Sequence, residues 1–384
     1  MRYIQSGMAV LFKPLRVRAL PIHLIIEPTT FCPLKCRMCK REKYITVPSH
    51  MSFEGFRKIF DQIKPLRLTL SGLGESLVNP ALVDMIRYAN GFGTAVSTTS
   101  SMALSDIPME QLVASGLKRL KISLDAADAK TYQDIRGLNL FDRVVENIKC
   151  MVALKRKKNT ILPHLCLQVV IQSKNISQLS RIVELAHNLG VNSISLEPVG
   201  LAGIEEKRDE LIAGLTTDEV ICQMKKARDT AKRVGMETNL NDLLVKNTIC
   251  KLWDVSLISP RPPRLRVRTT NQNIQNCSFP WFSMYITVDG EVRPCCMFSY
   301  VDAKFGNLLQ EDILTIWNNA RYQGFRQSLR QGKYPDIRCQ GCVPENIFDL
   351  SAVFRKIFTQ ITQISQITDE MGKKNLLACS RGRF

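Results

Sequence analysis

The sequence lacks any run of about eighteen apolar residues, the length that a membrane-spanning helix requires. It also lacks an export signal, because Lys13, Arg16 and Arg18 interrupt the apolar residues of positions 1–20 and no small-residue cleavage site follows them. Histidine is scarce, with only 4 residues, and these show none of the pair spacings that bind zinc. We therefore expect a cytoplasmic protein without a histidine-based zinc site.

Acidic residues are also few, with 35 Asp and Glu against 53 Lys and Arg, which gives a formal net charge of +18. This balance favours an anionic partner, which includes phosphate, carboxylate, nucleic acid and an acidic membrane surface. Cysteine, in contrast, is abundant, with 13 residues. In a reducing compartment such cysteines are metal ligands or small core residues, since disulfides do not persist there.

Short apolar segments rich in β-branched residues alternate with stretches of helical spacing, such as residues 53–63. The predicted strands are 23–28, 66–72, 93–99, 119–125, 164–171 and 193–199. Parallel strands need long crossovers between them, so this alternation predicts an α/β fold. We expect a partial (β/α)6 barrel with its chemistry at the carboxyl ends of the strands, and an open doubly wound sheet is the alternative.

The rest of the chain divides by composition. We expect an N-terminal extension (1–20), the barrel (21–235), a linker (236–276), a small domain (277–345) and a C-terminal helix and tail (346–384). The small domain contains a predicted hairpin around the Asp289-Gly290 turn. Apolar residues between 347 and 371 recur every three or four positions, which predicts an amphipathic helix.

Three cysteines, Cys32, Cys36 and Cys39, fall in the predicted loop after the first strand. Closely spaced loop thiolates can converge on one [4Fe–4S] cube, and three of them leave one iron open to another ligand. A zinc knuckle completed by a distant residue is the alternative, which the scarcity of histidine disfavours.

The spacing C-x3-C-x2-C after a first strand resembles the signature of the radical S-adenosylmethionine (SAM) superfamily, and further segments match that family in order. They are the segments 72–76 (GLGES), 97–101 (STTSS), 121–137 and 195–200. The resemblance assigns SAM contacts to Gly72, Leu73, Gly74, Glu75, Thr98, Ser123, Asp125, Arg136 and Glu197. The charge of Arg136 supports its role, because a guanidinium can donate two parallel hydrogen bonds to the SAM carboxylate.

The resemblance implies reductive cleavage of SAM at the cluster, a 5′-deoxyadenosyl radical, and hydrogen abstraction from a substrate. It also implies a reducing protein such as flavodoxin or ferredoxin as a partner. The protein would orient the cofactors and exclude stray hydrogen donors.

A second set of cysteines lies near the predicted hairpin: Cys277, Cys295, Cys296, Cys339 and Cys342. Four of these thiolates can close a second cube, and a structural zinc ribbon is the alternative. The pattern C-x12-G-x4-C followed by C-x2-C resembles the SPASM/twitch extension, as in twitch enzymes such as 2-deoxy-scyllo-inosamine dehydrogenase. This resemblance implies one auxiliary [4Fe–4S] cluster on Cys277, Cys295, Cys339 and Cys342, with Cys296 as the alternative to Cys295, and a role in electron relay.

We expect an oxidoreductase-type enzyme that acts on an anionic or lipid-like metabolite, with Arg264 and Arg266 near the substrate. The basic, apolar N-terminus and the C-terminal helix also predict contact with the inner face of a membrane. Ribosomal-peptide maturation is the alternative, although no peptide-recognition segment precedes the barrel. An iron–sulfur regulator that binds nucleic acid is a further alternative, which the SAM-site matches disfavour, so no specific nucleic acid is expected.

Overall fold

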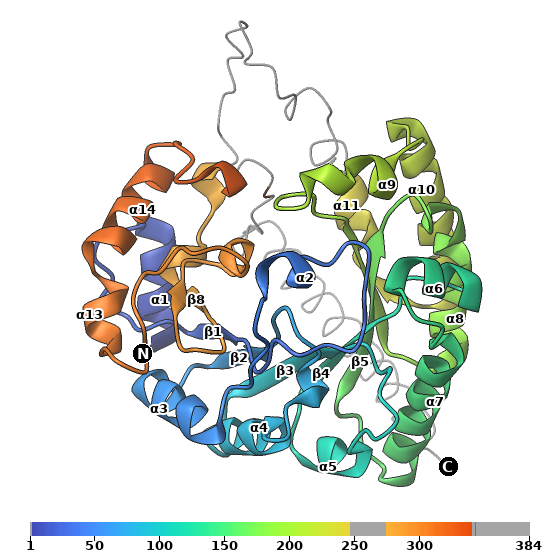
Figure 1. Cartoon of the computed structure of the whole chain (residues 1–384), viewed down its shortest axis with the longest axis horizontal. Helices are drawn as coiled ribbons and strands as arrows, with labels where there is room; N and C mark the ends of the chain where they lie inside the picture. Colours follow the sequence, from blue (N-terminus) through green and yellow to red (C-terminus); the bar gives the residue numbers. More distant parts are fainter. Residues whose placement is uncertain (1, 246–273, 340–341, 343–384) are drawn as a thin grey trace, which may run out of the picture.

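The computed structural model describes residues 2–245, 274–339 and 342. Within these residues the strands form one nine-stranded sheet in the order β7-β6-β5-β4-β3-β2-β1-β8-β9. The sheet curves into an open ring with helices α3 to α8 along its outer side (Figure 1). The predicted partial barrel is therefore confirmed, since β1 to β6 are the six predicted strands and all pair in parallel with their neighbours.

The strands are β1 (His23–Ile26), β2 (Arg67–Leu70), β3 (Ala95–Ser100), β4 (Arg119–Ser123), β5 (His164–Ile171), β6 (Ser193–Pro198), β7 (Glu237–Thr238), β8 (Ser283–Ile286) and β9 (Val292–Arg293). The helices between them are α2 (Arg41–Tyr44), α3 (Phe53–Ile63), α4 (Leu82–Gly91), α5 (Met109–Ala114), α6 (Ala129–Arg136), α7 (Phe141–Lys157), α8 (Leu179–Leu189), α9 (Arg208–Ile212), α10 (Thr217–Val234) and α11 (Leu240–Val245). Helix α1 (Arg2–Phe12) precedes the sheet, and α13 (Ile313–Trp317) and α14 (Ala320–Arg330) follow it.

Helix α3 shows how local sequence signals set these elements. It begins after Ser52, whose side chain accepts a hydrogen bond from the Gly55 backbone N–H at 3.0 Å and so caps a free donor. It ends at Lys64, which takes the left-handed conformation. Phe56, Ile59, Phe60 and Ile63 are buried, so one apolar stripe packs the helix on the core.

The two faces of the sheet differ in chemistry. Along β3 and β4, buried residues such as Val96 and Ile122 alternate with partly exposed ones such as Ser97 and Lys121. Because the helices cover the outer face, the partly exposed residues line the inside of the ring (Figure 1). The inside is polar: His23 hydrogen-bonds Thr69 and Ser283, and Thr69 hydrogen-bonds Ser97 at 3.1 Å.

The C-terminal segment extends the same sheet. Strand β8 pairs with β1 in parallel, with Leu24 opposite Met284, and β9 pairs with β8 in antiparallel fashion as the predicted hairpin. Two indoles fix this join, because Trp281 Nε1 donates to the Pro14 carbonyl and Trp317 Nε1 to the Ala19 carbonyl. Both C-terminal elements are thus packed against the segment that leads into β1.

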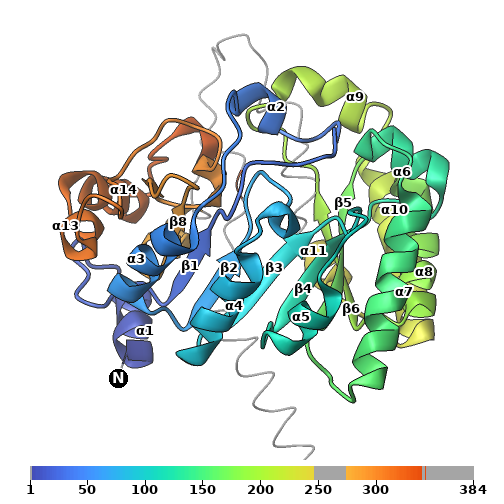
Figure 2. The ribbon, with the colours of Figure 1, turned by 60° about the horizontal axis from the view of Figure 1, so that its bottom comes forward.

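The loops that follow the strands and α2 lie at one end of the sheet, and α1 lies at the opposite end (Figure 2). The described part of the chain contains no helix that is both long and apolar enough to cross a bilayer. The helix predicted for 347–371 and the arginine-rich stretch 259–268 lie outside the described residues.

Candidate functional site

The first cysteine set lies in the loop that leaves β1 at the carboxyl end of the sheet. Cys32, Cys36 and Cys39 carry half-buried free thiols. The chain turns tightly at the last two, since the Cys39 N–H donates to the Cys36 carbonyl at 3.0 Å. Burial, together with the charges of Glu75, Cys36 and Cys39, raises the pKa of the Cys32 thiol to about 11. Because the raised pKa disfavours the thiolate form, these cysteines need a bound cation to become thiolates.

An ion pair joins this loop to the neighbouring strands. Arg136 Nη2 lies 2.5 Å from Asp125 Oδ2, and Arg136 Nη1 lies 3.6 Å from Cys36 Sγ. Asp125 is fully buried and also accepts from the Val170 N–H at 2.7 Å. Burial raises the pKa of Asp125, and Arg136 opposes that rise. The structure thus places the predicted SAM residues Asp125 and Arg136 together, beside a predicted cluster ligand.

The segment 72–76 packs directly on the cysteine loop. The Glu75 N–H donates to the Phe31 carbonyl at 2.7 Å, and the Glu75 side chain accepts from the backbone N–H and hydroxyl of Ser101, both at 2.7 Å. A Cβ on Gly74 would lie 2.2 Å from the Thr29 carbonyl oxygen. Only glycine therefore allows the two loops to approach so closely.

We expect Gly74→Ala to force these loops apart, because its clash is with backbone and not with a flexible side chain. The overpacking should lower the free energy of unfolding by about 1–3 kcal/mol and weaken SAM binding at least tenfold (about 1.4 kcal/mol). Gly91→Ala is the matched control, since a Cβ there meets nothing within 4 Å. Equilibrium dialysis with labelled SAM measures the binding, and thermal unfolding measures the stability. Unchanged SAM binding in Gly74→Ala would contradict the packing argument.

Sequence reasoning missed one residue of this site, Glu27. Its carboxylate is 2% exposed and accepts from the Leu73 N–H at 2.6 Å. A Cβ on Gly72 would lie 2.4 Å from this side chain, so Gly72 makes room for it. A signal was present, because Glu27 is the first acidic residue of the chain and directly follows a buried strand.

Burial raises the pKa of Glu27 to about 7, while the backbone N–H groups of Leu73 and Val288 and the nearby Tyr285 hydroxyl act in the opposite direction. Between pH 4.5 and about 7 the folded chain therefore binds more protons at Glu27 than the unfolded chain does, and stability falls as the pH rises. As the pH rises through that window, the free energy of unfolding of Glu27→Gln should increase by about 3 kcal/mol relative to that of the native protein. Chemical denaturation at several pH values measures this, and parallel stability profiles for the two proteins would refute it.

The second cysteine set is brought together at the hairpin. Cys277, Cys295, Cys339 and Cys342 influence one another electrostatically, and the Cys342 N–H donates to the Cys339 carbonyl at 3.4 Å. Burial, together with the charge of Cys277, raises the pKa of Cys339 to about 12. Cys296 is exposed and interacts with Lys40, next to the first cysteine set. Cys296 also lies beside Cys295, whose pKa it raises, so the assignment of Cys295 to the second set stays a prediction.

Both sets consist of thiols, which suit iron–sulfur clusters. Among residues 2–245, 274–339 and 342, no three His, Cys, Asp or Glu side chains stand close enough to hold a single metal ion. That finding concerns one ion, whereas a cube of irons and sulfides holds its ligands farther apart. The thiol-only donor sets and the glycine-lined approach of segment 72–76 therefore fit the expected groups.

Helix α2 connects the first cysteine loop to both sides of the ring. Lys40 Nζ lies 4.1 Å from the centre of the Tyr300 ring, and the Tyr44 hydroxyl donates to the Gly203 carbonyl at 2.9 Å. Gly203 has φ +86°, and a Cβ there would meet the Tyr300 ring at 2.5 Å. The segments after β6 and β9 are therefore held to the cysteine loop.

The other predicted residues are more scattered. Thr98 is buried and donates to the Leu70 carbonyl at 2.7 Å, so its hydroxyl is engaged within the sheet. Ser123 ends β4, and Glu197 is exposed near the end of β6. Arg264 and Arg266 lie outside the described residues.

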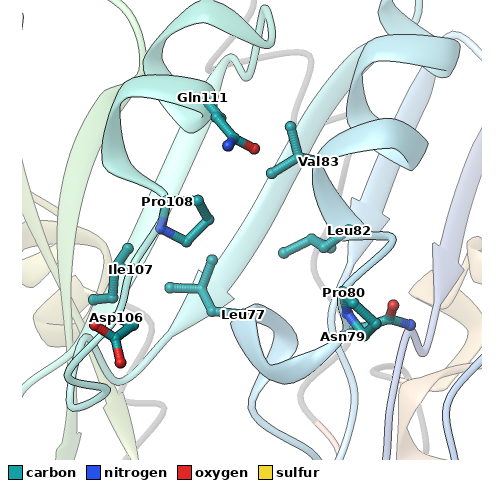
Figure 3. Close-up of a pocket in the computed structure, with 9 residues that line it drawn as sticks. All are labelled: Leu77, Asn79, Pro80, Leu82, Val83, Asp106, Ile107, Pro108 and Gln111. Carbon is teal, nitrogen blue, oxygen red and sulfur yellow. The ribbon is translucent and has the colours of Figure 1, made fainter.

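A cavity of about 460 Å³ opens between the starts of α4 and α5 (Figure 3). Leu77, Leu82 and Ile107 give it apolar walls, and Asp106 and Gln111 give it polar ones. No predicted cluster or SAM residue lines it. It is therefore separate from the site described above.

Comparison with known families agrees with this architecture. Residues 26–165 match the radical SAM superfamily, and residues 277–343 match SPASM, an iron–sulfur cluster-binding domain. The chain therefore contains a radical SAM domain and a SPASM domain, which indicate an enzyme that uses SAM, a [4Fe–4S] cluster and further iron–sulfur chemistry.

Two curated relatives are informative. The tungsten-containing aldehyde ferredoxin oxidoreductase cofactor-modifying protein of Pyrococcus furiosus is 24% identical over 340 residues, which are 83% of this chain and 86% of that protein. A protein of Saccharolobus islandicus named "Probable GTP 3′,8-cyclase" is 30% identical over 198 residues, 49% of this chain. That match spans only 61% of the cyclase.

Solved structures share the fold. Streptococcus suis SuiB aligns with a TM-score of 0.62 at 16% identity, over 84% of this chain and 71% of SuiB. The protein anSMEcpe with bound AdoMet aligns with a TM-score of 0.57 at 15% identity, over 81% and 84% of the two chains. At these identities the likeness supports the fold alone.

Proposed function

We propose that this enzyme cleaves SAM reductively and that the resulting 5′-deoxyadenosyl radical abstracts hydrogen from a phosphate- or carboxylate-bearing metabolite. The observation that carries the proposal is the contact between the first cysteine loop, Arg136 and the segment 72–76 at the carboxyl end of the sheet. In parallel α/β sheets this end is where cofactors and substrates bind.

Each predicted residue has a role in this proposal. Cys32, Cys36 and Cys39 would hold the SAM-binding cluster, which supplies the electron for cleavage when bound. The segment 72–76 would position the methionyl part of SAM, with Arg136 beside the cluster and Ser123, Thr98 and Glu197 around the nucleoside. Cys277, Cys295, Cys339 and Cys342 would hold an auxiliary cluster that relays an electron, and a flavodoxin or ferredoxin would supply the first one.

The inside of the ring supports an anionic substrate over a lipid-like one. Its partly exposed side chains include the hydroxyls of Thr69 and Ser97 and the cation Lys121, whereas the exposed Arg67 and Arg119 begin β2 and β4 at the opposite end from the cysteine loop. Cations and hydroxyls are what a phosphate or carboxylate requires, whereas an acyl chain requires apolar walls. Arg264 and Arg266 would add to this charge.

The name of one relative also supports an anionic substrate. The relative named "Probable GTP 3′,8-cyclase" is named for GTP, a substrate that carries phosphate groups. The match covers only part of that protein, so it supports the substrate class and not the particular nucleotide.

The test uses the reconstituted enzyme with SAM, dithionite and a small-metabolite fraction of cell extract. We expect the fraction to stimulate release of 5′-deoxyadenosine. Phosphatase treatment should remove that stimulation where the anionic group is a phosphate, and leave it where the group is a carboxylate. Lys121→Met should raise the amount of fraction needed by about tenfold, the loss of one charged hydrogen bond, while the surface control Lys149→Met leaves it unchanged. Stimulation by a peptide fraction, untouched by phosphatase, would overturn the substrate class and favour peptide maturation.

A further inference from the structure

Helix α1 presents an apolar stripe to solvent. Ile4, Met8, Leu11 and Phe12 are 72%, 50%, 67% and 64% exposed, which makes them four of the large apolar side chains most open to water in the described residues. Their spacing of four, three and one places them on one face of the helix. The opposite face packs on the core through Ala9 and Val10. The helix is therefore anchored on one side and unpartnered on the other within the described part of the chain.

The chain next to this stripe carries cations and no acidic residues. Residues 1–26 contain no Asp or Glu, and Arg16 and Arg18, just beyond the helix, are exposed. Residues 313–335 also lack Asp and Glu, and this segment includes α14, which contacts the short helix Phe279–Trp281 that α1 also contacts. Exposed apolar side chains next to unopposed cations are the features of a helix that lies in the interface of an anionic bilayer.

We infer that α1 docks the protein on a membrane surface rich in anionic phospholipid, with Ile4, Met8, Leu11 and Phe12 entering the headgroup region. This inference is independent of the proposed function, because it uses none of the residues of the cysteine sites.

Charge favours a membrane over the other possible partners of the exposed face of α1. A second copy of the chain would bring one basic surface against another, which is unfavourable at a net charge of +18. The segment 347–384 has six Lys and Arg against three Asp and Glu, so it too is basic. Only an anionic partner complements both the stripe and the cations around it.

The docked orientation has a consequence for catalysis. The helix lies at the end of the sheet opposite to α2 and the cysteine loop (Figure 2). A protein held by α1 would therefore turn the carboxyl ends of its strands toward water. Attachment would place the enzyme at the membrane and leave its substrate to arrive from solution, in keeping with the polar inside of the ring.

The test is vesicle sedimentation with the full-length, cluster-loaded protein. We expect binding to equimolar phosphatidylglycerol and phosphatidylcholine at least tenfold tighter than to phosphatidylcholine alone, and weaker as salt is raised. Replacing Leu11 and Phe12 together by Ser should weaken binding at least about tenfold. The double variant Arg16→Gln, Arg18→Gln removes two positive charges. It should bind anionic vesicles roughly 30-fold more weakly and bind neutral vesicles as the native protein does.

Ile161→Ser provides the matched control, since Ile161 is 86% exposed and lies between α7 and β5. It should bind vesicles as the native protein does. Iron content and thermal unfolding, equal in all variants, separate lost docking from lost folding. The inference is overturned if the native protein fails to bind anionic vesicles, binds neutral ones equally well, retains its affinity in both double variants, or forms a dimer that the Leu11 and Phe12 changes dissociate.

Discussion

Replacing Cys36 by Ala should abolish SAM cleavage, with the rate of 5′-deoxyadenosine release falling by about three orders of magnitude or more. Cys36 lies between the other two cysteines of the loop, and its sulfur contacts Arg136 at 3.6 Å. With only two thiolates left, the loop cannot hold a cube with one open iron. The auxiliary site does not depend on this residue, so we expect about half of the iron, roughly four atoms per chain, to remain.

The matched control is Cys150→Ala, because Cys150 is an exposed cysteine on α7 far in sequence from both sets. It should keep both the iron content and the rate of the native protein. The two variants are compared anaerobically after reconstitution with iron and sulfide. A Cys36→Ala protein that still cleaves SAM at the native rate would contradict the assignment of the first cysteine set.

The second large effect is expected from Arg136→Met. The variant leaves Asp125, which is fully buried, without the guanidinium that lies 2.5 Å away. Breaking a buried pair from one side destabilises a protein by about 3–5 kcal/mol, since the remaining charge is uncompensated. The variant also removes the donor to Cys36, so SAM cleavage should fall even at temperatures where the protein stays folded.

Two further variants make this prediction specific. Arg181→Met breaks an exposed pair with Asp128, and it should change stability by no more than about 1 kcal/mol. Adding Asp125→Asn to Arg136→Met removes the stranded charge and should restore much of the stability but not the activity. Denaturant titration gives the stabilities, and an Arg136→Met protein as stable as the native one would refute the buried-pair account.

The sequence predicted the strands of the barrel well because each carries its own signal. Segments such as 119–125 and 164–171 are short, β-branched and bounded by turns, and the helices between them have a regular apolar stripe. The cysteine sets were equally visible, since their spacing is local. Both kinds of signal depend on neighbours in the chain and need no knowledge of the fold.

Other features arise only from long-range packing. The pairing of β8 with β1 joins residues about 260 positions apart, and nothing in either strand encodes that register. The Asp125–Arg136 pair was expected to contact SAM, but the partnership between the two side chains depends on how α6 packs beside β4. The raised pKa of Glu27 likewise depends on burial, which arises only when distant segments such as the one containing Gly72 fold against it.

The most direct test of the account is to measure 5′-deoxyadenosine released by the native protein, reconstituted anaerobically and supplied with SAM and dithionite. We expect 5′-deoxyadenosine from a protein that contains about eight irons per chain, the content of two cubes. A protein that carries this iron and releases none would contradict it, whatever fold and family it shares.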